Sequence, residues 1–316
     1  THCISSAASD VYKRQVRIII ASSRFIIGKF GMSVAFLNNE FLPLDEAKIS
    51  PLDRGFLFGD GIYEVVPSYA GKFLGFNAHI DRMIDGLKSI KLNLNWQHDK
   101  WRNVCKELCE LNGNGNLGLY LQVSRGADNK RYHAFPQNVD PTVFCFAFEI
   151  GASPSADKSS AKTFSVSTTE DLRWQRCHIK STALLGNVLH FQHGYENGDD
   201  ETILFNSKGE LTEAAACNVF VVKNQVIMTP PLDNQLLPGI TRNLLLDILK
   251  KHSDFKIEER IIYKEEVLNA DEVWITSSTK EIGPVVKIDG NPVADGLIGD
   301  VWVEAQKLFT AHKYDY

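Results

Sequence analysis

Lys180 is the residue of this sequence that is best placed to do covalent chemistry. It lies in the stretch DLRWQRCHIKSTALLGN, where we expect a strand before it and a helix after it. Burial beside Ile179 would favour the neutral form of the amine, and a neutral lysine amine can attack an aldehyde to form a Schiff base. A solvent-exposed lysine at the boundary of two elements is the alternative, and the spacing alone does not decide between them.

Two loops in the second half of the chain carry groups that can bind phosphate. The stretch LPGITR runs from Leu237 to Arg242 and precedes an amphipathic run, so Gly239 allows a tight turn and Thr241 is a candidate N-cap. The first N–H groups of a helix bind phosphate through hydrogen bonds and the helix dipole. The run Thr276–Thr279 places hydroxyl groups after an apolar strand. An ordinary capped helix and a polar turn are the respective alternatives.

Two further stretches carry charges that suit a flat, anionic ligand. Glu213 is followed by three small alanines, which leave room for a ring, and a carboxylate beside a pyridine nitrogen keeps that nitrogen protonated. The loop SRGADNKRYHAFP holds Lys130, Arg131 and His133, and an arginine with a nearby imidazole suits a carboxylate. A solvated turn glutamate and a solvated basic loop are the alternatives.

Hydrophobic periodicity predicts the elements that position these groups. Helical spacing occurs at 79–90, 99–111, 181–195, 242–252 and 301–309, and strand-like runs occur at 33–37, 62–70, 119–124, 143–150, 163–168, 201–205, 217–222, 225–229 and 273–276. Glu213 is expected just before one of these strands. The strands and helices follow one another irregularly rather than as a repeated βα unit, so we expect an α+β fold.

The domain organisation follows from composition. The stretch GASPSADKSSAK at 151–162 is small, polar and rich in breakers, as linkers are. We therefore expect an N-terminal α/β domain over 32–150 and a C-terminal domain over 163–316 that carries the phosphate-binding loops. Residues 1–31 are expected to be a non-native or disordered leader, with Met32 as the start. A signal peptide within 15–30, which would imply export, is the alternative.

Charge and cysteine usage exclude several classes of function. The net charge of −5 argues against a nucleic-acid or anionic-membrane surface, and no apolar run is long enough to cross a bilayer. The six cysteines include no CxxC pair, which favours a reducing, cytoplasmic location. Cys105 and Cys109 are one helical turn apart without a histidine at ligand spacing, so we expect core residues and no metal.

Six stretches, taken in order, make the chain resemble the fold-type IV pyridoxal 5'-phosphate (PLP) enzymes, also called class IV aminotransferases. They are DRGFLFGDGIYEVV, HIDRM, RWQRCHIKSTALLGNVL, LTEAAACNVFVV, LLPGITR and WITSSTKEIGPV, and the resemblance spans residues 33–312. The resemblance implies a two-domain α+β fold and PLP as the cofactor. It also implies that the C-terminal domain holds PLP.

The resemblance further implies a role for each matching residue. Lys180 would bond the PLP aldehyde, Glu213 would face the pyridine nitrogen, and Leu237 would pack on the ring. Arg82, in HIDRM, would supply the cation for the phosphate. The remaining phosphate contacts would come from Gly239, Ile240, Thr241, Ser277 and Ser278.

Within the family, the chain is most similar to the D-amino acid aminotransferases, through DRGFLFGDGIYE and the loop around Arg131. That similarity implies that Tyr63, Arg131 and His133 bind the substrate α-carboxylate and that the loop reaches across the interface of a homodimer. The reaction would move an amino group between a D-amino acid and a 2-oxo acid such as 2-oxoglutarate. Branched-chain aminotransferases, 4-amino-4-deoxychorismate lyases and (R)-selective amine transaminases share the cofactor frame and are the alternatives.

Overall fold

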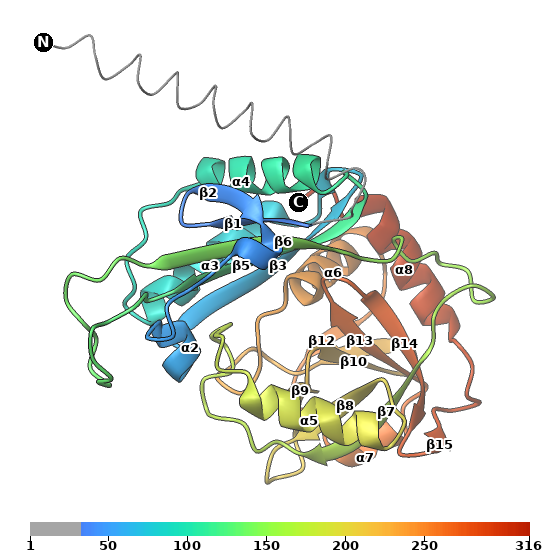
Figure 1. The fold of residues 1–316 in the computed structure, drawn as a ribbon. Helices are drawn as coiled ribbons and strands as arrows, with labels where there is room; N and C mark the ends of the chain where they lie inside the picture. The colour runs from blue at the N-terminus through green and yellow to red at the C-terminus, as the bar shows by residue number, and fades with distance from the viewer. Residues whose placement is uncertain (1–32) are drawn as a thin grey trace, which may run out of the picture.

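The protein is described by a computed structural model that covers residues 33–316, so the expectations about residues 1–31 and Met32 lie outside the described residues. The described chain forms two halves, each built around one β-sheet (Figure 1). This arrangement confirms the expected α+β class.

The first half is an antiparallel sheet covered by two helices. Its elements are β1 (Val34–Leu37), β2 (Glu40–Pro43), a 3-10 turn (Leu44–Glu46), α2 (Arg54–Phe58), β3 (Gly61–Tyr69), β4 (Lys72–Phe73), α3 (Phe76–Ser89), α4 (His98–Leu111), β5 (Asn116–Ser124) and β6 (Thr142–Glu149). The six strands have the order β2-β1-β6-β5-β3-β4. The apolar faces of α3 and α4 pack on the sheet through side chains such as Met83 and Trp101, which are fully buried in one core with Ile62 and Leu121. Each such side chain contributes about 1.5–3 kcal/mol when it leaves water.

The second half is a mixed sheet whose strands are buried on both faces. Its elements are β7 (Phe164–Glu170), α5 (Leu185–Glu196), β8 (Glu201–Phe205), β9 (Leu211–Ala214), β10 (Asn218–Lys223), β11 (Val226–Thr229), α6 (Ile240–His252), β12 (Ile257–Glu259), α7 (Lys264–Leu268), β13 (Glu272–Ser277), β14 (Glu281–Ile288), β15 (Asn291–Pro292) and α8 (Asp300–His312). The nine strands have the order β12-β11-β10-β13-β14-β7-β8-β9, and β15 pairs with β14. In β10, Val219 and Val221 enter one core, whereas Phe220 and Val222 enter the core under α6 and α8.

Three local expectations about the site elements were wrong. No strand precedes Lys180, and α5 begins at Leu185 rather than at 181, because residues 180–182 pair with β3 through the bridge between Ile62 and Ser181. The helix expected from 242 begins at Ile240 and has Gly239 as its N-cap, so Thr241 is not the cap. Glu213 lies inside β9 rather than before a strand.

Strand β14 was missed because its sequence contains Gly283 and Pro284, which ordinarily weaken strands. The structure shows why glycine is used there. A Cβ at Gly283 would lie 2.7 Å from the ring of Phe164 on the neighbouring strand β7. Close packing between strands therefore replaced the local pattern.

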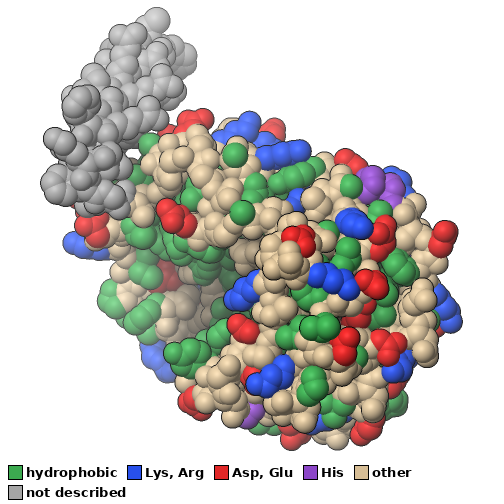
Figure 2. Space-filling model, turned by 90° about the vertical axis from the view of Figure 1, so that its right-hand side faces the viewer, with side chains coloured by type: hydrophobic (Ala, Val, Ile, Leu, Met, Phe, Trp, Pro, Cys, Tyr) green, Lys and Arg blue, Asp and Glu red, His purple; other side chains and the backbone are tan. Residues whose placement is uncertain are grey.

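Residues 151–162 connect β6 to β7 without a helix or strand, and their role as an interdomain linker stays a proposal. Cys105 and Cys109 are buried in the first core, as expected. Within residues 33–316, the helices are too short or too polar to cross a bilayer. On the face in Figure 2 the surface is hollowed, and acidic and basic side chains are interspersed over it.

Candidate active site

One cavity of about 370 Å³ collects most of the residues that the sequence singled out. Its walls come from both halves of the molecule: β3 and α3 from the first, and β9, the start of α6 and the end of β13 from the second. The predicted residues that line it are Tyr63, Arg82, Lys180, Glu213, Leu237, Gly239, Ile240, Thr241, Ser277 and Ser278.

The backbone of the segment that carries Lys180 is fixed to β3. The N–H of Tyr63 donates to the carbonyl oxygen of Lys180 at 3.1 Å, and the N–H of Thr182 donates to the carbonyl oxygen of Gly61 at 2.9 Å. Gly59, at φ +65°, permits the close approach, since a Cβ there would lie 2.8 Å from Cα of Ala183. The segment is thus held although it is neither helix nor strand.

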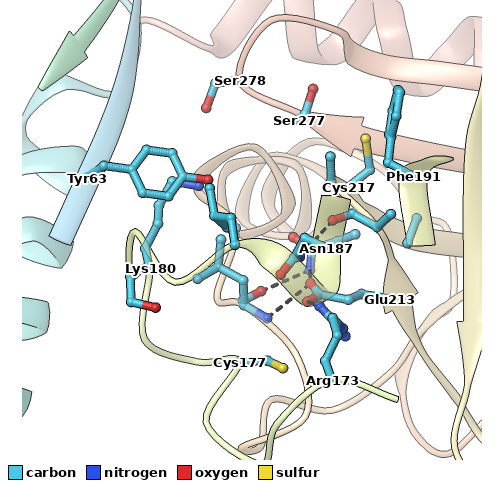
Figure 3. Close-up of a pocket in the computed structure, with 18 of the residues that line it drawn as sticks. Tyr63, Arg173, Cys177, Lys180, Asn187, Phe191, Glu213, Cys217, Ser277 and Ser278 are labelled. Carbon is cyan, nitrogen blue, oxygen red and sulfur yellow. Dashed lines mark hydrogen bonds and ion pairs between the residues drawn. The ribbon is translucent and has the colours of Figure 1, made fainter. Parts of the chain in front are cut away.

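The side chain of Lys180 points into the cavity beside Tyr63 (Figure 3). Its Nζ lies 4.2 Å from the centre of the Tyr63 ring. Among the described residues it has no ion-pair partner. The amine is therefore available to a ligand in the cavity.

Glu213 faces the cavity from another side and is held by three donors (Figure 3). Arg173 Nη1 donates to its Oε1 at 2.5 Å, and the Leu237 N–H and Asn218 Nδ2 donate to its Oε2 at 3.0 and 3.2 Å. Burial raises the pKa of Glu213 to about 7, although Arg173 opposes the rise. A carboxylate accepts about four hydrogen bonds, so Glu213 keeps room for one more donor.

Arg82 reaches the cavity from α3 as part of a buried ionic network. Its Nε and Nη2 donate to Glu64 Oε1 and Oε2 at 2.7 and 2.8 Å, and its Nη1 donates to the carbonyl oxygen of Pro238 at 2.8 Å. His79 Nδ1 lies 2.7 Å from the same Glu64 carboxylate. The remaining N–H groups of the two terminal nitrogens of Arg82 are available to an anion.

The edge of the cavity formed by α6 and β13 fits a phosphate group. The first N–H groups of α6, at Ile240 and Thr241, open the helix after Gly239. Thr276 Oγ1 is buried at this edge without a hydrogen-bond partner among the described residues. Ser277 and Ser278 lie along the same side (Figure 3). Hydroxyl and backbone donors without protein acceptors are the groups that an anionic phosphate requires.

Arg131 and His133 do not line the cavity of their own chain. They are exposed on the loop between β5 and β6, which projects from the edge of the first sheet (Figure 1). The structure thus places Tyr63 at the site but not its two expected partners.

The sequence analysis missed three residues that shape the site: Arg173, Asn218 and Glu64. Arg173 lies in a stretch used for the resemblance, and the acidic Asp171 two residues earlier was the available signal. It binds Asp171 at 2.7 Å as well as Glu213. Asn218 and Glu64 had no signal, because each acts through a partner distant in the sequence.

Comparisons with known proteins agree with this site. The model of the family "Amino-transferase class IV" matches residues 61–288. A D-alanine aminotransferase of Staphylococcus haemolyticus is 38% identical over 283 residues, which cover 89% of this chain and 98% of that protein. A D-alanine aminotransferase of Listeria monocytogenes is 35% identical over 275 residues, which cover 86% and 93%.

Solved structures share the fold. The branched-chain amino acid aminotransferase of Escherichia coli superposes with a TM-score of 0.81 at 22% identity, over 89% of this chain and 94% of that one. A second branched-chain amino acid aminotransferase, from T.th. and in complex with N-(5'-phosphopyridoxyl)-L-glutamate, gives a TM-score of 0.81 at 22% identity, over 90% and 95%. At this identity the likeness concerns the fold alone.

The chain belongs to the class IV aminotransferases, which are PLP-dependent transaminases. Its fold is the two-domain α+β fold of that class, as the resemblance implied. The D-alanine aminotransferases are similar to it over nearly their whole length.

Proposed function

We propose that this protein is a D-amino acid transaminase that takes an amino group from D-alanine or a similar D-amino acid and passes it to a 2-oxo acid such as 2-oxoglutarate. The observation that carries the proposal is the shared cavity, in which the Lys180 amine, the Glu213 carboxylate and the start of α6 face one space. The D-alanine aminotransferase relatives support the choice of substrate.

The described residues suggest how PLP would be held. The N–H groups of Ile240 and Thr241, with Thr276, Ser277 and Ser278, would bind the phosphate, and Arg82 would add positive charge. Leu237 would pack on the ring. Glu213 would face the pyridine nitrogen, because its carboxylate retains capacity for one further donor.

When bound, PLP supplies an aldehyde carbon that takes up the amino group and a ring that accepts the electron pair of a broken C–H bond. Lys180 Nζ would take the α-proton of the substrate and return it on the other side of the reaction, as a general base and then a general acid. Glu213 would stay ionised beside a cationic ring nitrogen, since a nearby positive charge lowers the pKa of a carboxyl group. The phosphate contacts would orient the ring against Lys180.

The substrate carboxylate would be bound by Tyr63 together with Arg131 and His133 from a second copy of the chain. Both loop residues lie away from the cavity of their own chain, so a homodimer would complete each site. Exposed apolar side chains on α5 support such an interface, since Leu185 is 71% exposed and Leu189 62%.

A cytoplasmic location is also proposed. Cys105, Cys109, Cys145, Cys177 and Cys217 are all free and buried in the described part of the chain. Free thiols in this number suit a reducing compartment.

Two paired assays test the substrate proposal. The PLP-loaded enzyme should transaminate D-alanine with 2-oxoglutarate at a kcat/KM at least about 100-fold above that for L-leucine with 2-oxoglutarate. The reverse order of the two values would indicate a branched-chain aminotransferase. Pyruvate released from 4-amino-4-deoxychorismate without an acceptor would indicate a lyase.

A chemical label tests the role of Lys180 independently of the substrate. Borohydride reduction of the PLP-loaded enzyme should attach the cofactor to the peptide that contains Lys180, and Lys180→Ala should lose this label while unfolding at a similar temperature. Label on another lysine would refute the assignment.

A further inference from the structure

The exposed loop that carries Arg131 and His133 is held from beneath by a single buried arginine. Arg54 is only 3% exposed, and its guanidinium donates to three successive carbonyl oxygens of the loop. Nη1 donates to Tyr132 at 2.5 Å and to Ala134 at 3.4 Å, and Nη2 donates to His133 at 3.1 Å. The planar guanidinium thereby fixes the path of the backbone where both side chains leave it.

A second residue of the same short helix supports the side chains. The ring centre of Phe58 lies 5.3 Å from the guanidinium carbon of Arg131 and 5.3 Å from the ring centre of His133. The guanidinium carbon of Arg54 lies 4.9 Å from the same ring. Phe58 thus forms a platform on which the Arg131 and His133 side chains rest.

Helix α2 is itself tied to the body of the first half. Arg54 Nε donates to Asp60 Oδ2 at 2.8 Å, and Arg125 binds both oxygens of Asp60 at 2.8 and 3.0 Å. Asp53 caps the helix through the Gly55 N–H at 2.8 Å. The loop residue Tyr132 is 58% exposed, so the order of this loop comes from α2 rather than from burial.

We propose that α2 is the positioning element of the substrate-carboxylate loop, with Arg54 fixing the backbone and Phe58 orienting Arg131 and His133. This inference rests on the proposed role of that loop. Carboxylate recognition by an exposed arginine requires the guanidinium to be held in place, because a mobile side chain loses conformational entropy on binding. The DRGFLF stretch would then serve the substrate without touching it.

Variants of α2 test the proposal through a split between two affinities. Arg54→Lys keeps the charge but not the planar set of donors, and Phe58→Leu removes the platform. Each should raise KM for D-alanine about tenfold while leaving the PLP dissociation constant and kcat within about twofold. The matched control is Phe56→Leu, which makes the same change on the exposed side of the same helix and should leave KM unchanged. A loss of PLP affinity in parallel with KM would indicate a general structural role and overturn the proposal.

A double-mutant cycle separates this inference from the proposed function. If Phe58 acts through Arg131, then Phe58→Leu should raise KM much less in an Arg131→Ala background than alone. Additive effects would overturn the inference and leave the role of Arg131 intact. An Arg131→Ala variant with unchanged KM would overturn both.

Hydrogen exchange gives an independent reading of the loop. The amides of residues 131–135 should exchange faster in Arg54→Lys than in the wild type, while those of β5 stay unchanged. Unchanged exchange in the loop would contradict the role of Arg54.

Discussion

Glu64 and Glu213 are both buried, yet burial leaves them with opposite acidities. Burial would raise the pKa of Glu64, but the charge and hydrogen bonds of Arg82, with a further contribution from His79, lower it to about 2. Burial raises the pKa of Glu213 to about 7, because its one arginine is shared with Asp171. The number of cations per carboxylate decides the difference. Glu64 is a permanent anion, whereas Glu213 responds to a charge placed beside it.

Glu64→Gln tests this assignment through the pH dependence of stability. A carboxyl whose pKa falls from its ordinary value of 4.5 to about 2 on folding contributes stability above pH 4.5 and loses it as pH falls towards 2. The variant should be less stable at pH 7 by about 3 kcal/mol. Its free energy of unfolding should also vary less than that of the wild type between pH 5 and pH 2.

Urea denaturation at several pH values provides the measurement. Parallel pH profiles for the two proteins would mean that Glu64 titrates near its ordinary value in the folded state. Gln retains the shape of the side chain, so a difference in profile reports on charge.

At the scale of elements, the start of α6 must approach β10 closely. Gly239 has φ −64°, which any residue can adopt, so glycine is needed there for space rather than for backbone freedom. A Cβ at Gly239 would lie 1.9 Å from Asn218 Oδ1. Asn218 Nδ2 in turn donates to the carbonyl oxygen of Leu237 at 2.9 Å and to Glu213. The phosphate edge and the carboxylate are therefore coupled through one amide.

Gly239→Ala should consequently damage both parts of the site. The displaced Asn218 should cost about 1–3 kcal/mol of stability and weaken PLP binding at least about tenfold. Gly151→Ala is the matched control, because a Cβ at Gly151 meets nothing within 4 Å. Absorbance titration with PLP and thermal unfolding check both effects. Wild-type PLP affinity in Gly239→Ala would show that the helix start accommodates the methyl group.

At the scale of the whole molecule, the cavity lies between the two halves, while the carboxylate loop lies away from it. A second copy that supplies this loop would give each site residues from two chains, as a two-fold interface allows. The position of the loop thus predicts a measurable exchange of function between copies.

Complementation tests this arrangement. Lys180→Ala and Arg131→Ala each impair every site of their own homodimer. Random pairing of the two variants should restore about a quarter of the wild-type sites, because half of the dimers are mixed and each has one unmodified site.

The control is a mixture of Lys180→Ala with Glu213→Gln, which changes two residues of the same cavity and should restore no site. Light scattering should show dimers in both mixtures. Dimers without recovery in the first mixture would place Arg131 and Lys180 in the site of one chain.

The sequence by itself determined the periodic helices α4 and α8, the strands with uninterrupted apolar runs, and the residues that face the cavity. Periodicity sufficed for these elements because it depends on neighbours within one turn or one strand. Lys180, Glu213 and the LPGITR and TSST loops were identified because their residue types carry the chemistry wherever the chain places them.

Only the tertiary structure decided how these residues are held. The start of α5 moved to Leu185 because Ser181 pairs with Ile62 of the other half. The partners of Glu213 and Arg82 lie far along the chain at Arg173 and Glu64, and the loop of Arg131 was placed away from the cavity. Such contacts depend on the order of strands in two sheets, and no local spacing encodes that order.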